Sequence, residues 1–312
     1  MNKMVSTKNM SRADWLEHRK AGIGGSDAAA ILGISPWSSA LTVYMDKLGL
    51  SNEQPENEAI WLGLVLEDAV AERFEDETGM IVQRRNAIFQ HPEHNFMLAN
   101  IDRWIVGKNA GLEIKTTSMM NKTDFEDGVI PPNYYCQCLH YMAVTGADEW
   151  YLAVLVIGKA LHILHVERKE SEIEALIQAE KDFWENHIIA RIPPPPDGSE
   201  AAGEILKGMY PRATDLSLVP IYGKEDKIQT ILDLKEQIKA LEKQQDKLEQ
   251  EIQSEIGQHD GAEANGFRVY WKNQSRTGVD SKKLKEAYPE VYQDVLKTSE
   301  YRKFDIKSLK GA

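Results

Sequence analysis

The chain has 312 residues, 42% of them hydrophobic and 28% charged, which is the composition of a globular protein long enough for two domains. It has no apolar run long enough to span a bilayer, and its two cysteines exclude a disulfide scaffold and fit a reducing compartment. The net charge of −12 does not exclude nucleic acid as a partner, because residues 266–310 carry eleven Lys and Arg against six Asp and Glu.

The first part of the chain is predicted to be helical. Its polar beginning lacks the apolar segment of a signal peptide, so we expect a cytoplasmic protein. A short amphipathic helix over 12–22 precedes a second helix in "GGSDAAAIL", where Ser26 is the expected N-cap and Asp27 favours the first turn. A third helix is predicted over 39–49. The fourth, over 57–78, has an apolar face and a strongly acidic face.

The pattern then changes to strands. Three alternating segments predict strands, and a turn over 107–111 that contains Gly and Asn joins the last two as a hairpin. A helix, two further strands and a closing helix follow. In chain order, these elements span residues 80–90, 96–106, 112–117, 133–145, 149–158, 160–168 and 170–190.

The stiff sequence "RIPPPP" predicts the end of the first domain. We expect a domain over 1–192, a proline-containing linker over 193–224 and a C-terminal region over 225–312. The C-terminal region carries heptads over 225–256, with Gln245 as a polar residue in the seam. The apolar seam positions are Ile231, Leu234, Ile238, Leu241, Leu248 and Ile252. A second helix of the same domain is the favoured partner for this seam, and a second copy of the chain is the alternative.

The stretch "GLEIKTT" carries the first chemical signal. In a strand, Glu113 and Lys115 share one face while Leu112 and Ile114 share the other. Asp102 lies eleven residues upstream of Glu113, before the hairpin turn, so strand pairing could bring the two carboxylates together. Two carboxylates and an amine suit Mg²⁺ or Mn²⁺. Spacing alone supports this metal site and a solvated ion pair on an edge strand about equally.

A resemblance decides between these interpretations. The order helix, strand, D-(x10)-E-x-K, helix resembles the core of PD-(D/E)xK nucleases. The segments "HRKAGIGGSDAAAILGISPW", "LEIKTT" and "YYCQCLHYMAVTG" resemble the YqaJ-type viral recombinases, relatives of lambda exonuclease, over roughly residues 12–190. The resemblance implies an α/β fold, with a restriction-endonuclease-like central mixed sheet flanked by helices and a mainly helical C-terminal appendage.

The resemblance also implies the residues of an active site. The implied catalytic residues are Asp102, Glu113, Lys115 and Gln137. The implied metal ligands are Asp102, Glu113 and the backbone carbonyl of Ile114, with Glu67 on the acidic helix as a further candidate. Mg²⁺ is the expected cofactor, and Mn²⁺ the substitute. A second glutamine often found two residues after the first is Leu139 here, so that contact is missing.

A site for the 5′-phosphate of DNA is implied near the N-terminus. Relatives of lambda exonuclease use an Arg and a Ser seven residues apart, and Arg19 and Ser26 have that spacing. A helix N-terminus with the amides of "GIGG" favours an anion, and an arginine can clamp it. Asn100 stands where the family can use a phosphate-binding Ser, and its amide can still donate a hydrogen bond. Without the resemblance, Ser26 would be an ordinary cap and Arg19 a surface residue.

The function implied is a metal-dependent 5′-to-3′ exonuclease that acts on double-stranded DNA and generates single strand for phage-type recombination, in the cytoplasm of a bacterial host. The implied partners are double-stranded DNA ends, further copies of the chain in a ring such as a trimer, and a single-strand-annealing recombinase, with no membrane. One alternative is a DNA endonuclease on the same core. The other is a non-catalytic recombination adaptor, which the intact Asp102, Glu113 and Lys115 argue against.

Four tryptophans are expected in the core rather than in platforms that stack on bases: Trp37, Trp61, Trp104 and Trp150. An exposed position is the alternative for Trp37, because it follows a Gly/Pro turn.

Overall fold

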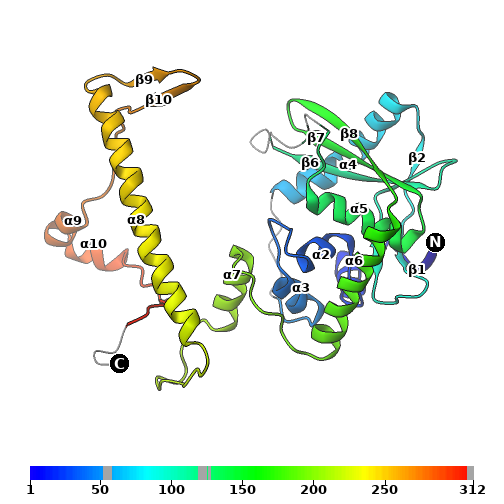
Figure 1. Cartoon of the computed structure of the whole chain (residues 1–312), viewed down its shortest axis with the longest axis horizontal. Helices are drawn as coiled ribbons and strands as arrows, with labels where there is room; N and C mark the ends of the chain where they lie inside the picture. Colours follow the sequence, from blue (N-terminus) through cyan, green and yellow to red (C-terminus); the bar gives the residue numbers. More distant parts are fainter. Residues whose placement is uncertain (52–57, 119–124, 126–127, 308–312) are drawn as a thin grey trace. The chain divides into compact units, whose positions relative to one another are not determined.

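A computed structural model of the chain describes residues 1–51, 58–118, 125 and 128–307. The chain forms two compact units, Met1–Met209 and Tyr210–Ala312 (Figure 1). The first unit has a central mixed sheet flanked by helices, and the second is mainly helical, so the predicted fold class is confirmed. None of the helices in the described ranges has an apolar stretch that could cross a membrane.

The helices predicted near the N-terminus are present, and one of them is capped differently than expected. They are α1 (Arg12–Lys20), α2 (Gly25–Ile31), α3 (Ala40–Lys47) and α4 (Glu58–Thr78); residue 57, the predicted start of the fourth, lies outside the described residues. The N-cap of α2 is Gly24, so Ser26 is the second residue of the helix and not its cap. The amide of Gly24 donates instead to the Asp27 carboxylate, Oδ2, at 2.9 Å.

The main sheet has five strands in the order β2-β5-β6-β7-β8. Only the β6–β7 pair is parallel. The strands are β2 (Val82–Gln83), β5 (Arg103–Ile105), β6 (Ala110–Thr117), β7 (Glu149–Val156) and β8 (Ala160–Glu167). The strand that carries Glu113 and Lys115 is therefore the middle strand of the sheet, which rules out the edge-strand interpretation. Its Leu112 and Ile114 are buried in an apolar cluster with Phe74 of α4, as the alternation predicts.

A smaller sheet has three strands in the order β1-β3-β4. These are β1 (Asn2–Ser6), β3 (Ala87–Gln90) and β4 (Leu98–Asn100). The predicted strands 80–90 and 96–106 are each split between the two sheets. The first breaks where Asn86 takes a positive φ of 43°, and the second breaks around Asp102, which lies between β4 and β5. Asp102 thus occupies the point where the chain passes from one sheet to the other.

The loop between α1 and α2 is attached to the smaller sheet. The amide of Ile23 donates to the Phe96 carbonyl at 2.6 Å, and the Leu98 amide donates to the Ile23 carbonyl at 2.8 Å. This approach requires Gly22, because a Cβ there would lie 2.6 Å from the Phe96 carbonyl oxygen. The attachment holds the segment with Arg19 and Ser26 beside the strand that leads to Asp102.

Helix α5 (Pro132–Thr145) packs beside α2, α6 (Glu170–Phe183) and β7 (Figure 1). A π-helical turn over Trp184–Ile189 continues α6. His140 of α5 is fully buried and joins three elements: its Nδ1 lies 2.7 Å from Glu180 Oε1 of α6, and its Nε2 lies 2.8 Å from the Leu98 carbonyl of β4.

The first unit extends past the boundary predicted at residue 192. Helix α7 (Glu200–Met209) lies in the predicted linker and packs on α3, where its Ala202 is buried with Leu41 and Phe183. A polar, proline-rich composition predicted a linker, but the apolar side of α7 anchors this segment.

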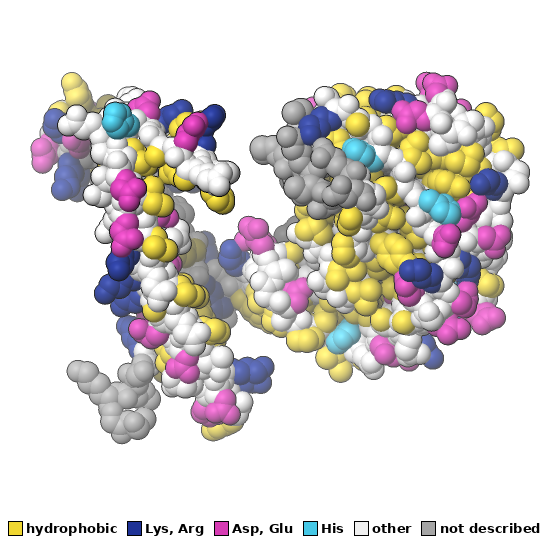
Figure 2. All heavy atoms as spheres, turned by 45° about the horizontal axis from the view of Figure 1, so that its top comes forward, with side chains coloured by type: hydrophobic (Ala, Val, Ile, Leu, Met, Phe, Trp, Pro, Cys, Tyr) yellow, Lys and Arg dark blue, Asp and Glu magenta, His cyan; other side chains and the backbone are white. Residues whose placement is uncertain are grey.

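The second unit contains the predicted long helix, α8 (Glu225–Ile256), within its expected bounds. A hairpin, β9 (Gly261–Ala264) with β10 (Phe267–Tyr270), and two short helices, α9 (Ser281–Ala287) and α10 (Pro289–Asp294), follow. The seam of α8 is exposed, with Leu241 at 63% and Leu248 at 60%. Apolar side chains are visible along this helix in the space-filling view (Figure 2). Within residues 210–307, no second helix buries this seam, so the partner helix favoured by the sequence is not found there.

Candidate active site

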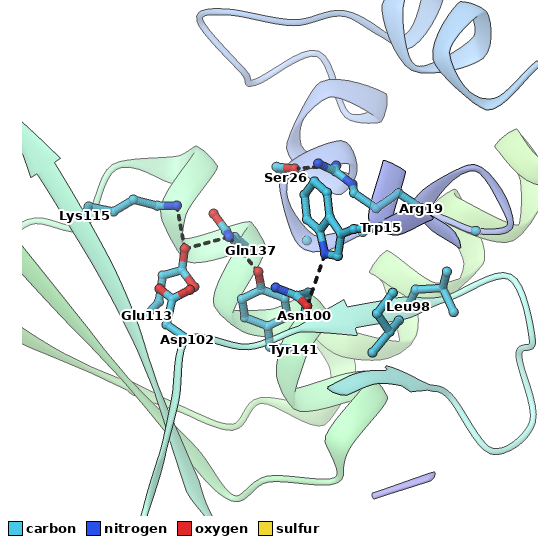
Figure 3. Close-up of a pocket in the computed structure, with 14 residues that line it drawn as sticks. Trp15, Arg19, Ser26, Leu98, Asn100, Asp102, Glu113, Lys115, Gln137 and Tyr141 are labelled. Atoms are coloured by element: carbon cyan, nitrogen blue, oxygen red, sulfur yellow. Dashed lines mark hydrogen bonds and ion pairs between the residues drawn. The ribbon is translucent and has the colours of Figure 1, made fainter. Parts of the chain in front are cut away.

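A cavity of about 230 Å³ in the first unit brings most of the predicted site residues together (Figure 3). Its walls come from α1, α2, β4, β6, α5 and the segment around Asp102. The predicted residues that line it are Arg19, Ser26, Asn100, Asp102, Glu113, Lys115 and Gln137. Arg19 and Gln137, which are more than a hundred residues apart in the sequence, therefore line the same cavity. Their spacing in the sequence alone does not predict this.

The carboxylate pair results from strand pairing. Strands β5 and β6 align Arg103 with Leu112, so Asp102 lies next to Glu113. The Ile114 amide donates to Asp102 Oδ2 at 2.8 Å and fixes that carboxylate. Glu113 is 2% exposed, and its Oε1 accepts a hydrogen bond from Gln137 Nε2 at 2.8 Å and pairs with Lys115 Nζ at 2.5 Å.

The two carboxylates and the amine shift one another's pKa values. Burial raises the pKa of Asp102, and repulsion from Glu113 raises it further, so that the pKa lies well above its usual value. Burial lowers the pKa of Lys115, but the attraction of Glu113 and Asp102 outweighs burial and the net shift is upward, which keeps the amine protonated. Glu113 Oε2 is buried and accepts no hydrogen bond from the described part of the chain.

These observations fit Mg²⁺, which is bound in proteins through one or two carboxylates and keeps several waters or substrate phosphates as its other ligands. Asp102 and the unpartnered Oε2 of Glu113 would supply the carboxylates. No cluster of three or more His, Cys, Asp or Glu side chains suited to a metal occurs in the ranges that the structure describes. The remaining ligands would therefore come from backbone, water or DNA, which is the arrangement that magnesium tolerates and zinc does not.

The two further predicted ligands differ in position. A strand residue directs its N–H and C=O to the same side, so the carbonyl of Ile114 faces the side on which Asp102 accepts the Ile114 amide. Glu67 does not line the main cavity. It lines a neighbouring cavity of about 190 Å³ that also contains Asp102, and its carboxylate is paired with Arg103, whose Nη1 also donates to the Asp102 carbonyl at 2.8 Å.

The opposite side of the cavity carries a positive group. Arg19 Nη2 donates to Ser26 Oγ at 3.3 Å and to Asp27 Oδ1 at 3.2 Å, and the guanidinium lies 5.0 Å from the centroid of the Trp15 ring. Both hydrogen bonds that hold the guanidinium to described residues start from Nη2, so Nε and Nη1 are available to a ligand. Asn100 also lines the cavity, and its Oδ1 accepts from Trp15 Nε1 at 3.4 Å, which leaves its amide N–H groups for another acceptor.

A buried lysine supports Arg19. Lys47 Nζ lies 2.6 Å from Asp27 Oδ2 and donates to the Arg19 carbonyl at 3.0 Å. Burial by itself raises the pKa of Asp27, but the attraction of Lys47 and then Arg19 outweighs burial, and the pKa falls to about 2. The group of three thus carries a net positive charge, so Asp27 positions Arg19 without cancelling its attraction for an anion.

Sequence reasoning missed several residues of this site. Tyr141 accepts a hydrogen bond from Gln137 Nε2 at 2.9 Å; its spacing of four from Gln137 on one helix was a usable signal. Trp15 and Arg19 are also four apart on α1. Lys47 carried no signal, because only the packing of α3 on α1 and α2 brings it to Asp27.

The sequence itself matches known proteins. Residues 14–148 match the YqaJ-like viral recombinase domain. The chain is 38% identical over 310 residues to a protein of Bacillus subtilis (strain 168) described as uncharacterized protein YqaJ, covering 98% of this chain and 97% of that protein.

Solved structures resemble it more weakly. The alkaline exonuclease LHK-Exo from Laribacter hongkongensis has a TM-score of 0.48 and 22% identity over 57% of this chain and 95% of that one. A phage related exonuclease from Haemophilus somnus 129PT has a TM-score of 0.43 and 12% identity over 55% and 96%. The assignment therefore depends on the sequence matches, one of which spans nearly the whole chain: this protein belongs to the YqaJ-like viral recombinase family.

Proposed function

We propose that the chain is a metal-dependent exonuclease that degrades double-stranded DNA from a 5′ end and leaves single strand for recombination. One observation carries the proposal: a single cavity holds both the group Asp102, Glu113 and Lys115 and the pair Arg19 and Ser26. The first group has the chemistry for phosphodiester hydrolysis, and the second has the chemistry for holding a terminal phosphate. The membership of a viral recombinase family agrees with this use.

The carboxylate group does the chemistry. When bound there, Mg²⁺ would activate its water ligand and neutralise charge on the scissile phosphate. Asp102 and Glu113 would hold the cation, and Gln137 fixes the orientation of Glu113 through its hydrogen bond to Oε1. Lys115 stays protonated in this arrangement, so it offsets the negative charge that develops on the phosphate or orients the attacking water by donating to it.

The arginine group sets the direction of digestion. The free N–H groups of Arg19 and the hydroxyl of Ser26 would bind the 5′-phosphate, and the amide of Asn100 is a further donor on the same wall. Gly24 does not contribute its amide, because Asp27 already occupies it. A phosphate fixed at this point places only a nearby phosphodiester over the carboxylates, so cleavage proceeds from the 5′ end.

The partners follow from this activity. Double-stranded DNA ends are the substrate, further copies of the chain in a ring such as a trimer would keep the enzyme on one strand, and a single-strand-annealing recombinase would receive the product. We place these events in the bacterial cytoplasm, where phage-type recombination takes place.

The test is digestion of linear duplexes with 5′-phosphate, 5′-hydroxyl or hairpin-closed ends, with Mg²⁺, with Mn²⁺ and with chelator. We expect stepwise release of nucleotides from 5′-phosphorylated ends, only with the metal. Asp102→Ala and Glu113→Ala should abolish cleavage with an unchanged circular dichroism spectrum, and Lys115→Ala should lose most of the rate but still bind metal. Equal cleavage of closed and open ends would establish the endonuclease alternative. A folded protein that cuts none of the substrates would establish the adaptor.

A further inference from the structure

Trp37 occupies an exposed position that the first expectation for it did not foresee. It is 65% exposed. Trp104 and Trp150 are buried in the core as predicted, whereas the same prediction is wrong for Trp61, which is 53% exposed. Trp37 lies in the loop between α2 and α3, where its amide donates to Ser35 Oγ at 3.3 Å. A single exposed apolar side chain is ordinary on a protein surface. Exposure alone therefore does not indicate a binding role for the indole, and its neighbours have to be considered.

The indole is the outer member of an aromatic stack. Its ring centroid lies 6.2 Å from that of Tyr134, with 30° between the planes. Tyr134 in turn stacks on the buried Phe125 at 6.4 Å and 17°. Phe125 thus supports the Tyr134 ring, and Tyr134 supports one side of the Trp37 indole, whose other side is exposed to solvent.

The stack also leads to the active site. Lys115 Nζ lies 5.5 Å from the centroid of the Tyr134 ring, a cation–π distance, while it pairs with Glu113. Tyr134, Gln137 and Tyr141 recur at spacings of three and four along α5 and so share one helix face. Gln137 and Tyr141 line the cavity, and Tyr134 therefore continues this lining from the carboxylate group toward Trp37.

We infer that Trp37, supported by Tyr134, stacks on an unpaired or terminal nucleobase of the DNA end, a few nucleotides at most from the scissile phosphate. The inference rests on the proposed function. Contacts of 5.5 and 6.2 Å connect Lys115 to Trp37, and stacked bases are about 3.4 Å apart along a strand, so the distance suits neighbouring nucleotides. Stacking on an indole accepts every base, because each has a π face. A contact that tolerates every base suits an exonuclease that advances through any sequence.

The test uses the full-length protein with Ca²⁺ in place of Mg²⁺ and a 5′-phosphorylated duplex that carries 2-aminopurine at successive positions from the end of each strand. The wild-type protein should change the 2-aminopurine emission at one or two adjacent positions. Trp37→Ala should remove that change and weaken end binding roughly 5- to 150-fold, the effect of losing one base–aromatic stack. Trp37→Phe should restore most of both. With Mg²⁺, the loss should appear mainly in KM.

Ile34→Ala is the matched control, since it removes an exposed apolar side chain from the same loop without an aromatic face. It should behave as wild type. The stacking inference is overturned if Trp37→Ala binds ends and quenches 2-aminopurine as wild type does, or if Ile34→Ala is equally impaired, while the wild type still digests DNA. If the wild-type protein neither binds nor cuts DNA ends, the proposed function fails, and this inference fails with it.

Discussion

At the scale of single residues, the proposed active site works against the stability of the fold. Asp102 is a half-buried carboxylate beside the buried carboxylate of Glu113, and the upward shift of its pKa means that its charge costs free energy in the folded state. Asp27 is also buried, but Lys47 and Arg19 stabilise its charge and lower its pKa. The two aspartates thus have opposite effects on folding, because repulsion from Glu113 and burial dominate at Asp102, whereas attraction by Lys47 and Arg19 dominates at Asp27.

Asp102→Asn should therefore abolish metal-dependent cleavage and raise the melting temperature of the protein without metal. The amide keeps an acceptor for the Ile114 amide and removes the repulsion from Glu113. A gain of 1 kcal/mol would raise the midpoint by about 2–4 °C in a unit of this size. The difference from wild type should vanish in acid, below the ordinary pKa of aspartate, and grow as the pH rises through the raised pKa of Asp102.

Asp27→Asn serves as the opposite control in the same scans. Its folded-state pKa of about 2 lies below the ordinary 3.8, so its charge stabilises the fold by roughly 2 kcal/mol above the ordinary pKa. That stability should be lost as the pH falls through about 2. A variant at Asp102 that melts below wild type at neutral pH would contradict the repulsion between the two carboxylates.

Arg19→Ala should distinguish a phosphate clamp from a general DNA contact. A charged hydrogen bond contributes about 1.5–3 kcal/mol, so digestion of 5′-phosphorylated ends should slow by roughly ten- to a hundredfold. Ends with a 5′-hydroxyl should be affected much less, because they present no dianion to the guanidinium. Ser26→Ala should act in the same direction but more weakly.

The control for this comparison is Arg73→Ala, which removes an exposed arginine paired with Glu77 on the surface of α4. It should leave the preference for phosphorylated ends unchanged. Equal slowing of phosphorylated and hydroxyl ends by Arg19→Ala would refute the end-anchored mechanism.

At the scale of elements, the sequence predicts well what local pattern determines. The alternation in β6 placed Glu113 and Lys115 on one face, and heptads gave the bounds of α8. Features that depend on tertiary packing could not be read in this way. The break of the predicted strands at Asn86 and Asp102 follows from membership of two sheets, and the capping of α2 by Asp27 replaces the serine that local preference favours. Lys47 reached the site through helix packing alone, with no local signature.

The contact that joins α5, α6 and β4 provides a prediction at this scale. His140→Ala removes the partner of the Glu180 carboxylate and of the Leu98 carbonyl. The side chains of His140 and Glu180 are both fully buried. Breaking a buried pair in this way costs about 3–5 kcal/mol, which urea denaturation should show as a lower midpoint. Tryptophan fluorescence reports mainly on the first unit, because only Trp271 of the seven tryptophans lies in the second.

His165→Ala is the matched control, because His165 Nε2 lies 2.6 Å from Glu149 Oε2 in a partly exposed pair. An exposed pair contributes about 0–1 kcal/mol. If both substitutions lower the midpoint by similar amounts, the buried pair does not hold the three elements together.

At the scale of the whole molecule, charge is unevenly distributed along the chain. The chain is acidic overall, yet the cavity wall with Arg19 and the tail over 266–310 are basic, and the buried Lys47 pairs with Asp27 behind that wall. A net charge of −12 would disfavour binding to DNA along its length, whereas a local positive site favours a terminal phosphate. The two units also differ in how they are stabilised: the first has three buried apolar clusters, while the described part of α8 leaves its apolar seam exposed.

The exposed seam predicts that α8 pairs with a second copy of the chain. Leu241 and Leu248 stand in strict heptad positions on a helix of 32 residues, and burying such a seam is what drives coiled coils to associate. The double variant Leu241→Glu, Leu248→Glu should therefore lower the mass measured by light scattering and leave the melting of the first unit unchanged. Ala240→Glu, Gln250→Glu adds the same charge outside the seam and should keep the wild-type mass. If the seam variant instead keeps its mass and only the second unit melts earlier, the seam packs within one chain. If neither the mass nor the melting of the second unit changes, the heptads of α8 bury nothing.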